Sequence, residues 1–335
     1  MINYDLTTIW ALIIAFAVFM YVVMDGFDLG IGILFPTFGK GQERSQAMNA
    51  IAPVWDGNET WLVLGGVGLL AAVPLAFAII IPAVYFPILL MLLGLIFRGV
   101  AFEFRLKTTR ARHWWNRSFF VGSLVATYFQ GVVLGMFVEG FEVQGRTYAG
   151  GTFDWLRPFP LLTGAGLVAG YVLLGATWLV MKTEGDLQAW ARRAAGVGLA
   201  GVLAFIAMVS IWTPLAHADI AARWFGWPNL LLLAPVPLIT GGIALVLWRS
   251  LRSGGEHLPF LAAMGLFAMG YLGLAISLFP YIVPYRVTLW QAASSPSTQA
   301  FLLIGTLFLL PIVFMYTGWS YYVFRGKVRA EIGYH

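Results

Sequence analysis

Cysteine is absent from the 335-residue chain, and charged residues are scarce. Without cysteine there are no disulfides, cysteine-ligated zinc sites, iron–sulfur clusters or thiol nucleophiles. Only 10% of the residues are charged and 60% are hydrophobic, whereas a soluble domain is about half apolar and a quarter charged. This composition excludes a water-soluble enzyme and a disordered chain. The apolar runs are long and do not alternate every second residue, so the chain is expected to be a helical protein that crosses the membrane several times.

The few charged residues divide the chain into nine predicted membrane-spanning helices. The uncharged run at 60–97 has 38 residues, too many for one span of about 20 residues, and it predicts two helices that turn near Val73-Pro74. We expect all the spans to form one polytopic domain over residues 1–335. The other predicted spans lie within 6–24, 118–138, 158–181, 194–216, 224–248, 258–285 and 300–324.

Lysine and arginine are distributed unevenly between the two sides of this predicted arrangement. If the nine spans alternate in direction, 16 of the 20 basic residues fall on one side and 4 on the other. Because cytoplasmic loops carry the excess of basic residues, the N-terminus is predicted outside and the C-terminus in the cytoplasm. The basic stretch at 105–117 is therefore interpreted as a topology anchor, and no nucleic-acid partner is expected.

Acidic residues lie near the ends of the first two predicted spans. Asp25 and Asp28 lie near the cytoplasmic end of the first span, and their spacing of three residues places both on one helix face. Asp56 and Glu59 repeat this spacing in the first two turns of the second span. Ionisable groups within a bilayer are expensive, so each is a candidate functional residue.

Arg98 closes the third span on the same side, with Glu103 beyond it. Four carboxylates and a guanidinium are therefore expected to gather at the cytoplasmic ends of three consecutive helices. Acids near the start of the second span could simply stabilise its helix dipole, but Asp25 and Asp28 lie toward a helix C-terminus, the unfavourable end. The functional interpretation is a proton-uptake or cation-binding site, because closely spaced, desolvated carboxylates repel each other and can hold and release protons.

Histidine is scarce, and the usual catalytic motifs are missing. None of the four histidines lies in the middle of a predicted span. A membrane cytochrome b holds haem with axial histidine or methionine, and an isolated methionine is more often a packing residue than a ligand. We therefore expect no haem, metal or catalytic residue in this chain, and any haem of its complex to be held by another chain.

Six motifs carry a family resemblance. They are DGFDLG at 25–30, IAPVWDGNETWL at 51–62, FRGVAFEFR at 97–105, FPYIVP at 279–284, LW at 289–290 and YTGWSYY at 316–322. Together they resemble subunit II of cytochrome bd-type quinol oxidases over nearly the whole chain. The ending at 322–327 resembles the cyanide-insensitive branch, and Gln291 stands where many members carry an acid.

The resemblance implies an all-α integral membrane protein with nine helices, commonly two four-helix bundles plus a peripheral helix. It implies a partner, subunit I, that holds haem b and haem d and oxidises quinol, and it leaves room for a small single-span accessory subunit. Oxygen is then reduced to water with cytoplasmic protons, which generates a proton-motive force. The chain itself would bind no haem, contact membrane lipid in the bacterial cytoplasmic (inner) membrane, and help to form the proton and oxygen routes.

By resemblance, the proton-path residues are Asp25, Asp28, Asp56 and Glu59. The residues that support them are Arg98, Trp55, Asn58, Trp61 and Glu103. Two other hypotheses stay open. One is a stand-alone ion-coupled transporter that uses the same carboxylates, although the paired broken helices and inverted repeat typical of transporters are not clear in the sequence. The other is a purely structural scaffold for subunit I.

Overall fold

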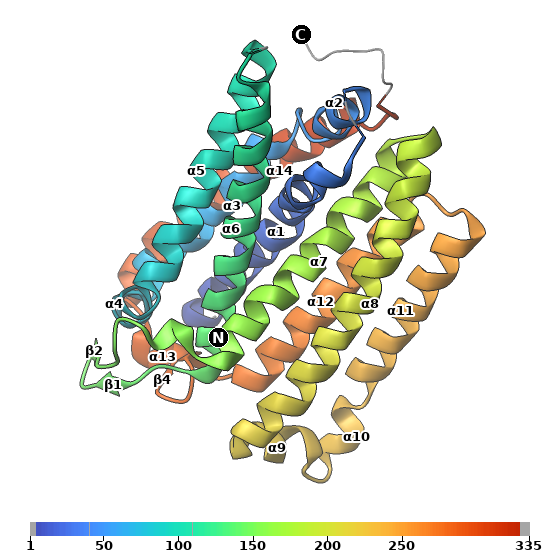
Figure 1. Ribbon diagram of the computed structural model, residues 1–335. Helices are drawn as coiled ribbons and strands as arrows, with labels where there is room; N and C mark the ends of the chain where they lie inside the picture. The colour runs from blue at the N-terminus through green and yellow to red at the C-terminus, as the bar shows by residue number, and fades with distance from the viewer. Residues whose placement is uncertain (1–4, 40, 109, 329–335) are drawn as a thin grey trace.

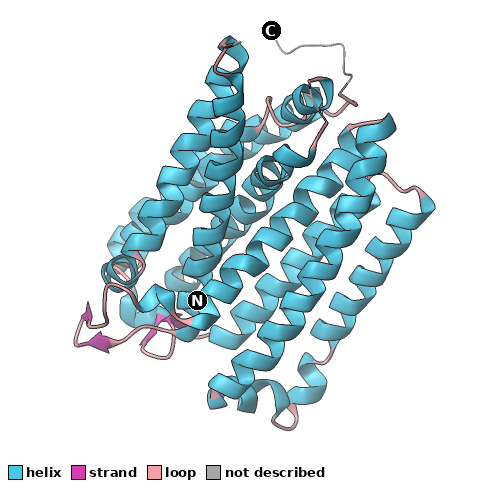
Figure 2. Ribbon diagram, viewed as in Figure 1, coloured by secondary structure: helices cyan, strands magenta, loops and turns pink. Residues whose placement is uncertain are grey.

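The computed structural model describes residues 5–39, 41–108 and 110–328. Long helices lie side by side and alternate in direction, and short helices and two small hairpins join them at their ends (Figure 1). Figure 2 shows how little of the chain is strand. The long helices are α1 (Leu6–Leu34), α3 (Trp55–Ala72), α5 (Tyr85–Lys107), α6 (Arg112–Glu139), α7 (Pro158–Lys182), α8 (Gly185–Ala216), α11 (Pro235–Ser253), α12 (Leu258–Leu278) and α14 (Pro296–Val323).

The shorter elements lie between the long helices. In the hairpins, Val143 pairs with Tyr148 and Tyr281 pairs with Thr288, both in antiparallel register. The short helices are α2 (Gln42–Asn49), α4 (Pro74–Ala83), α9 (Ala218–Phe225), α10 (Asn229–Leu233) and α13 (Leu289–Ala292), with 3-10 turns η1 (Phe35–Thr37) and η2 (Asp154–Leu156). The strands are β1 (Val143–Gln144), β2 (Thr147–Tyr148), β3 (Tyr281–Val283) and β4 (Val287–Thr288).

Eight helical segments of the described chain are long and apolar enough to cross a membrane. They are α1 with η1, α5, α6, α7, α8, α10 with α11, α12 and α14. The remaining long helix, α3, has 18 residues and therefore a length of about 27 Å. Its first two turns carry Asp56, Asn58 and Glu59, which lower its hydropathy. The second predicted span is thus present as a helix, but it lacks the apolar composition of the other eight.

Prolines mark helix boundaries in two of the predicted regions. α3 ends near the predicted turn at Val73-Pro74, but α4 follows before α5 begins. Pro74 starts α4 because a proline needs no N–H donor in the first helical turn. The span predicted within 224–248 is present, but it lies at Asn229–Ser253 and is divided into α10 and α11. Trp224 belongs to α9, which ends at Phe225, and Pro235 begins α11 because a proline needs no N–H donor in the first helical turn.

The first helix continues well beyond its uncharged stretch, as expected. α1 has 29 residues, about 43 Å, and Asp5 caps its start by accepting a hydrogen bond from the Thr7 N–H at 3.1 Å. Its glycines permit backbone contact with α7. A Cβ added at Gly30 would lie 1.8 Å from the Tyr171 carbonyl oxygen, and one at Gly175 would lie 2.6 Å from the Gly30 carbonyl carbon. This close approach fixes the rotation of α1 relative to α7.

Candidate functional site

Arg98 of α5 lies at the centre of a cluster of acids from α1 and α3. Its Nη1 is 2.7 Å from Asp25 Oδ1 and 4.0 Å from Glu59 Oε1, and its Nη2 is 3.8 Å from Asp28 Oδ2. The side chains of Asp25 and Asp28 are 0% exposed, that of Arg98 is 1% exposed and that of Glu59 is 26% exposed. Three helices thus bring three carboxylates to one guanidinium, and two of the three carboxylates have no contact with solvent.

Asn58 joins this cluster to the C-terminal helix. Its Nδ2 donates to Asp28 Oδ2 at 2.7 Å and to the Met24 carbonyl at 3.2 Å. Its Oδ1 accepts a hydrogen bond from the hydroxyl of Tyr321 on α14 at 2.8 Å. Because the amide is used at both ends, Asn58 fixes the position of the Asp28 carboxylate relative to α14.

Two tryptophans of α3 shape the surroundings of the cluster. The guanidinium of Arg98 lies 5.7 Å from the ring centre of Trp55, a cation–π distance. Trp55 also packs against Phe102 of α5, with 5.2 Å between the ring centres. Trp61 is buried and meets the ring of Phe16 edge-on at 5.9 Å. Trp55 thus covers Arg98, whereas Trp61 joins α3 to α1.

The gathering of four carboxylates predicted from the sequence holds for Asp25, Asp28 and Glu59 and needs correction for Asp56. The face of α3 that meets α1 carries Asn58, so Asp56, two residues away, lies on the opposite side of the helix and is exposed. Asp56 still interacts electrostatically with Glu59.

Glu103 lies apart from the acid cluster. Its side chain is 54% exposed, and its ion-pair partner is Lys107, one turn further along α5, at 4.0 Å. Glu103 is therefore a surface residue of this chain, and an exposed pair of this kind stabilises a helix only slightly.

Two tyrosines at the cluster were not predicted as site residues. Tyr321 was noted only within a family motif, yet it is the partner of Asn58. Tyr21 is buried one turn before Asp25 and interacts electrostatically with Asp25 and Arg98. Its spacing of four residues from Asp25 is the signal that could have identified it, because residues four apart share a helix face.

Gln291 has a local structural role. Its Oε1 accepts from the Thr288 N–H at 2.9 Å, while Thr288 Oγ1 accepts from the Gln291 N–H at 3.4 Å. This reciprocal capping box starts the short helix α13. A neutral glutamine satisfies the cap, so the fold needs no acid at this position.

The chemistry of the cluster suits the binding and release of protons. Arg98 already supplies a fixed cation at its centre, so a change in the charge of the carboxylates is most simply a gain or loss of protons. Among the described residues, no group of three or more histidine, aspartate and glutamate side chains has an arrangement that could hold a metal ion.

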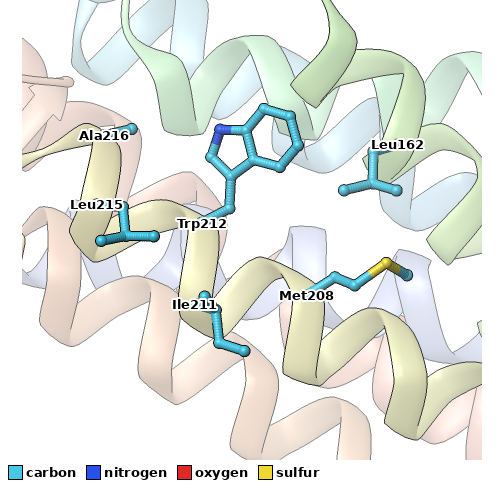
Figure 3. A pocket seen from close by; sticks show the side chains of 6 residues that line it. All are labelled: Leu162, Met208, Ile211, Trp212, Leu215 and Ala216. Atoms are coloured by element: carbon cyan, nitrogen blue, oxygen red, sulfur yellow. The ribbon is translucent and has the colours of Figure 1, made fainter.

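A separate pocket of about 630 Å³ lies between α7 and α8, away from the acids (Figure 3). Its lining is apolar: Leu162 from α7 and Met208, Ile211, Trp212, Leu215 and Ala216 from α8. A smaller, more polar pocket of about 220 Å³ shares Trp212 and Ala216 with it. Neither pocket contains a residue of the acid cluster.

The chain resembles known proteins over almost its whole length. It is 30% identical to cytochrome bd-I ubiquinol oxidase subunit 2 of Escherichia coli (strain K12), with 99% of this chain and 97% of the relative aligned. It is also 30% identical to cytochrome bd ubiquinol oxidase subunit 2 of Bacillus subtilis (strain 168), with 97% of each covered. The bd oxidase structure from Geobacillus thermodenitrificans shares its fold, with a TM-score of 0.77 at 17% identity over 95% of this chain and 98% of that chain. The profile described as cytochrome bd terminal oxidase subunit II matches residues 6–324, so the chain belongs to that family.

Proposed function

We propose that this chain is the haem-free subunit of a two-subunit bd-type quinol:oxygen oxidoreductase and that it takes up protons for oxygen reduction through the cluster around Arg98. Family membership makes it a subunit of a quinol oxidase in the bacterial cytoplasmic (inner) membrane. The observation that carries the proposed proton role is that three carboxylates share one buried guanidinium.

Charge balance supports proton binding at this cluster. One guanidinium balances one carboxylate, whereas Asp25, Asp28 and Glu59 all lie within 4.0 Å of Arg98. An uncompensated charge in a buried site costs several kcal/mol. Protons bound to the remaining carboxyl groups remove this cost. Because the three carboxyl groups lie around the same guanidinium, a proton bound by one of them changes the charge balance that the other two share.

Exposure decreases along the acids in the order expected for an uptake route. Asp56 lies at the surface, Glu59 is partly exposed, and Asp28 and Asp25 are fully buried. In the proposed route a cytoplasmic proton reaches Asp56 or Glu59 first and then passes to the buried pair. Arg98 holds the buried carboxylates in place, and Asn58 orients Asp28.

The proposed complex extends beyond this chain. Subunit I would hold haem b and haem d and oxidise quinol, and a small single-span subunit and membrane lipid would complete the assembly. Within this chain we propose nine spans, which are the eight apolar segments and α3. We place the N-terminus outside and the C-terminus in the cytoplasm. We also propose two four-helix bundles with α14 as the peripheral helix, and an apolar path for oxygen between helices.

Substitution of Asp28 by asparagine in the intact two-subunit complex tests the proton role. We expect Asp28→Asn to slow oxygen consumption with quinol by at least an order of magnitude, typical of the loss of a proton-transfer group. The oxidised and reduced absorption spectra of the haems should not change. Glu103→Gln is the matched control, because it neutralises an exposed acid outside the cluster. Normal turnover in Asp28→Asn would remove Asp28 from the proton path.

Purification separates this proposal from the stand-alone transporter, which none of the comparisons supports. A haem-containing partner that co-purifies with the chain supports the oxidase. A colourless chain that transports an ion by itself would overturn it. Neutralisation of Asp25, Asp28, Asp56 and Glu59 together without loss of turnover would instead support a purely structural subunit.

A further inference from the structure

Helix α6 carries a polar stripe on a buried face. Ser123, Thr127 and Gln130 are spaced by four and three residues and therefore share this face. Ser123 and Thr127 are 0% exposed. The side-chain oxygens Oγ of Ser123, Oγ1 of Thr127 and Oε1 of Gln130 are all buried without a hydrogen-bond partner.

The buried threonines of α7 behave differently. Thr163 and Thr177 donate to carbonyl oxygens of their own helix, Thr163 to Pro160 at 2.8 Å and Thr177 to Leu173 at 2.8 Å. This bond to the preceding turn is the usual way in which a threonine satisfies its hydroxyl inside a helical protein. Thr127 does not make it, so its hydroxyl is available to another partner.

A second stripe on α1 faces the α6 stripe. Tyr21, Asp25, Asp28 and Gly32 are spaced by four, three and four residues, which places them on one face over about 16 Å of helix. The contact is close, because a Cβ added at Gly32 would lie 2.0 Å from Ser123 Oγ. α1 and α6 run in opposite directions (Figure 1). Thr127 and Gln130, which follow Ser123 on α6, therefore lie along the part of α1 that precedes Gly32.

Tyr171 of α7 lies at the end of the two stripes that carries Tyr21 and Gln130. It is 0% exposed, and neither its hydroxyl nor that of Tyr21 has a hydrogen-bond partner of normal geometry, although Tyr171 interacts with Gln130 and Tyr21 interacts with Asp25. Tyr171 lies next to Gln130 and interacts electrostatically with both Asp25 and Tyr21. The polar side chains of α1, α6 and α7 therefore meet one turn deeper in the protein than the acids.

Most of the unsatisfied buried polar atoms of the described chain gather here. Eight of the thirteen such side chains belong to this region: Tyr21, Asp25, Asp28, Arg98, Ser123, Thr127, Gln130 and Tyr171. An unsatisfied buried polar group costs about 1–3 kcal/mol, so isolated exceptions are tolerated but a contiguous group of eight is not. Water that makes two to four hydrogen bonds is the usual solution.

We propose that α1, α6 and α7 enclose a chain of bound water molecules that runs from Ser123 past Asp28 and Asp25 to Tyr21, Gln130 and Tyr171. Hydroxyl and amide groups both donate and accept, so they suit water. A metal cation in the same space would face the positive charge of Arg98. The water site stands on the geometry alone. Its role as an inward continuation of the proton route rests on the function proposed above.

Radiolytic hydroxyl labelling with mass spectrometry tests the water site in the intact two-subunit complex. Hydroxyl radicals formed from bound water modify the side chains that touch it. The labelling rate of each side chain is divided by its rate in the denatured chain. On this scale we expect Tyr21 and Tyr171 to be labelled many-fold faster than Phe27 and Phe119. The two phenylalanines are the controls because they are also buried but carry no polar group. Labelling of the two tyrosines as slow as that of the phenylalanines would overturn the water site.

Two substitutions test the role of the water in proton transfer. We expect Thr127→Val and Gln130→Leu to reduce oxygen consumption several-fold and to lower the labelling of Tyr171, with unchanged haem spectra. Thr177→Val is the matched control, because its hydroxyl is already bonded within its own helix. Normal turnover in both test variants, with Asp28→Asn still slow, would overturn the transport role but not the proposed function. Normal turnover in Asp28→Asn as well would overturn both.

Discussion

The charged cluster of α1, α3 and α5 and the buried threonines of α7 satisfy their polar groups in opposite ways. In the first group, Arg98 of α5 reaches Asp25 and Asp28 of α1, and Asn58 of α3 reaches Asp28. On α7, Thr163 and Thr177 bond to the carbonyls of their own helix. The hydroxyls of these two threonines are therefore satisfied as soon as α7 forms, whereas the charged groups of the cluster need three helices to assemble.

This difference indicates where function lies. A self-satisfied threonine adds no charge and no net demand on a neighbouring helix. A buried acid costs free energy that packing alone does not repay, and such residues in membrane proteins mark ion and proton pathways. The contrast between the two regions can be tested by substitutions, taken here from the largest expected effect to the smallest.

The largest loss of stability is expected from Arg98→Gln. It leaves Asp25 and Asp28 buried without a positive partner, and removal of one member of a buried ion pair costs about 3–5 kcal/mol. The measurement is the thermal unfolding midpoint of the purified complex, together with its yield. Lys107→Gln is the control, because its side chain is 76% exposed and its ion pair is worth about 0–1 kcal/mol. Equal losses in the two variants would contradict a central role for Arg98.

Gly30→Ala should disturb the contact between α1 and α7. The added Cβ would lie 1.8 Å from a backbone oxygen of Tyr171, so one helix must move, at a cost of about 1–3 kcal/mol. Gly196→Ala in α8 is the matched control, because its Cβ meets nothing within 4 Å and alanine favours helix by about 1 kcal/mol. Thermal unfolding of both variants checks this, and the idea fails if Gly30→Ala is as stable as the parent.

Tyr321→Phe removes the hydrogen bond between α14 and the cluster. The expected loss is about 0.5–1.5 kcal/mol, because Asn58 keeps its other two hydrogen bonds. Turnover should fall less than in Asp28→Asn, since Tyr321 positions Asn58 and carries no proton in the proposed route. Tyr316→Phe is a suitable control on the same helix, because that side chain is 62% exposed. A loss of turnover equal to that of Asp28→Asn would place Tyr321 on the route itself.

The smallest effect is expected where the chain beyond α14 contacts the end of α7 and the loop between α11 and α12. Lys327 Nζ lies 2.9 Å from Glu256 Oε2, and the Val328 N–H donates to the Lys182 carbonyl at 2.8 Å. Hydrogen bonds from Gln188 and Lys327 hold the pKa of Glu256 below its usual value. The ion pair therefore persists at neutral pH and is lost as the pH falls through this lowered pKa.

Hydrogen exchange at Val328 measures this ion pair. We expect Glu256→Gln to lower the protection factor of the Val328 amide at neutral pH and to abolish its decline in acid. Glu184→Gln is the control, because Glu184 is exposed and has no ion pair within the described residues. An unchanged protection factor in Glu256→Gln would show that the backbone hydrogen bond alone holds the segment.

Most residues of the candidate site can be identified from the sequence. The errors and omissions share one physical reason. Asp25, Asp28, Glu59 and Arg98 stand out because a charge inside an apolar run is visible without coordinates. Asp56 was grouped with them because helical spacing relates residues to each other but does not say which face meets a neighbour.

The polar stripe on α6 shows the same limit. Its spacing was available in the sequence, but Ser, Thr and Gln are neutral and common in membrane helices, so nothing marked them. Their significance follows from unpartnered oxygens on a buried face of α6 that meets α1 at Gly32.

The sequence by itself determined that the chain is a helical membrane protein, where most of its long helices lie and which acidic residues are candidates for the site. It could do so because composition, hydropathy and spacing are properties of the chain. Only the tertiary structure decided which side chains share the cluster. That choice depends on the rotation of α1, α3 and α5 about their axes, which is set by packing between distant segments such as Gly30 against Tyr171. A rotation of one residue turns a helix by about 100°, enough to exchange a buried acid for an exposed one.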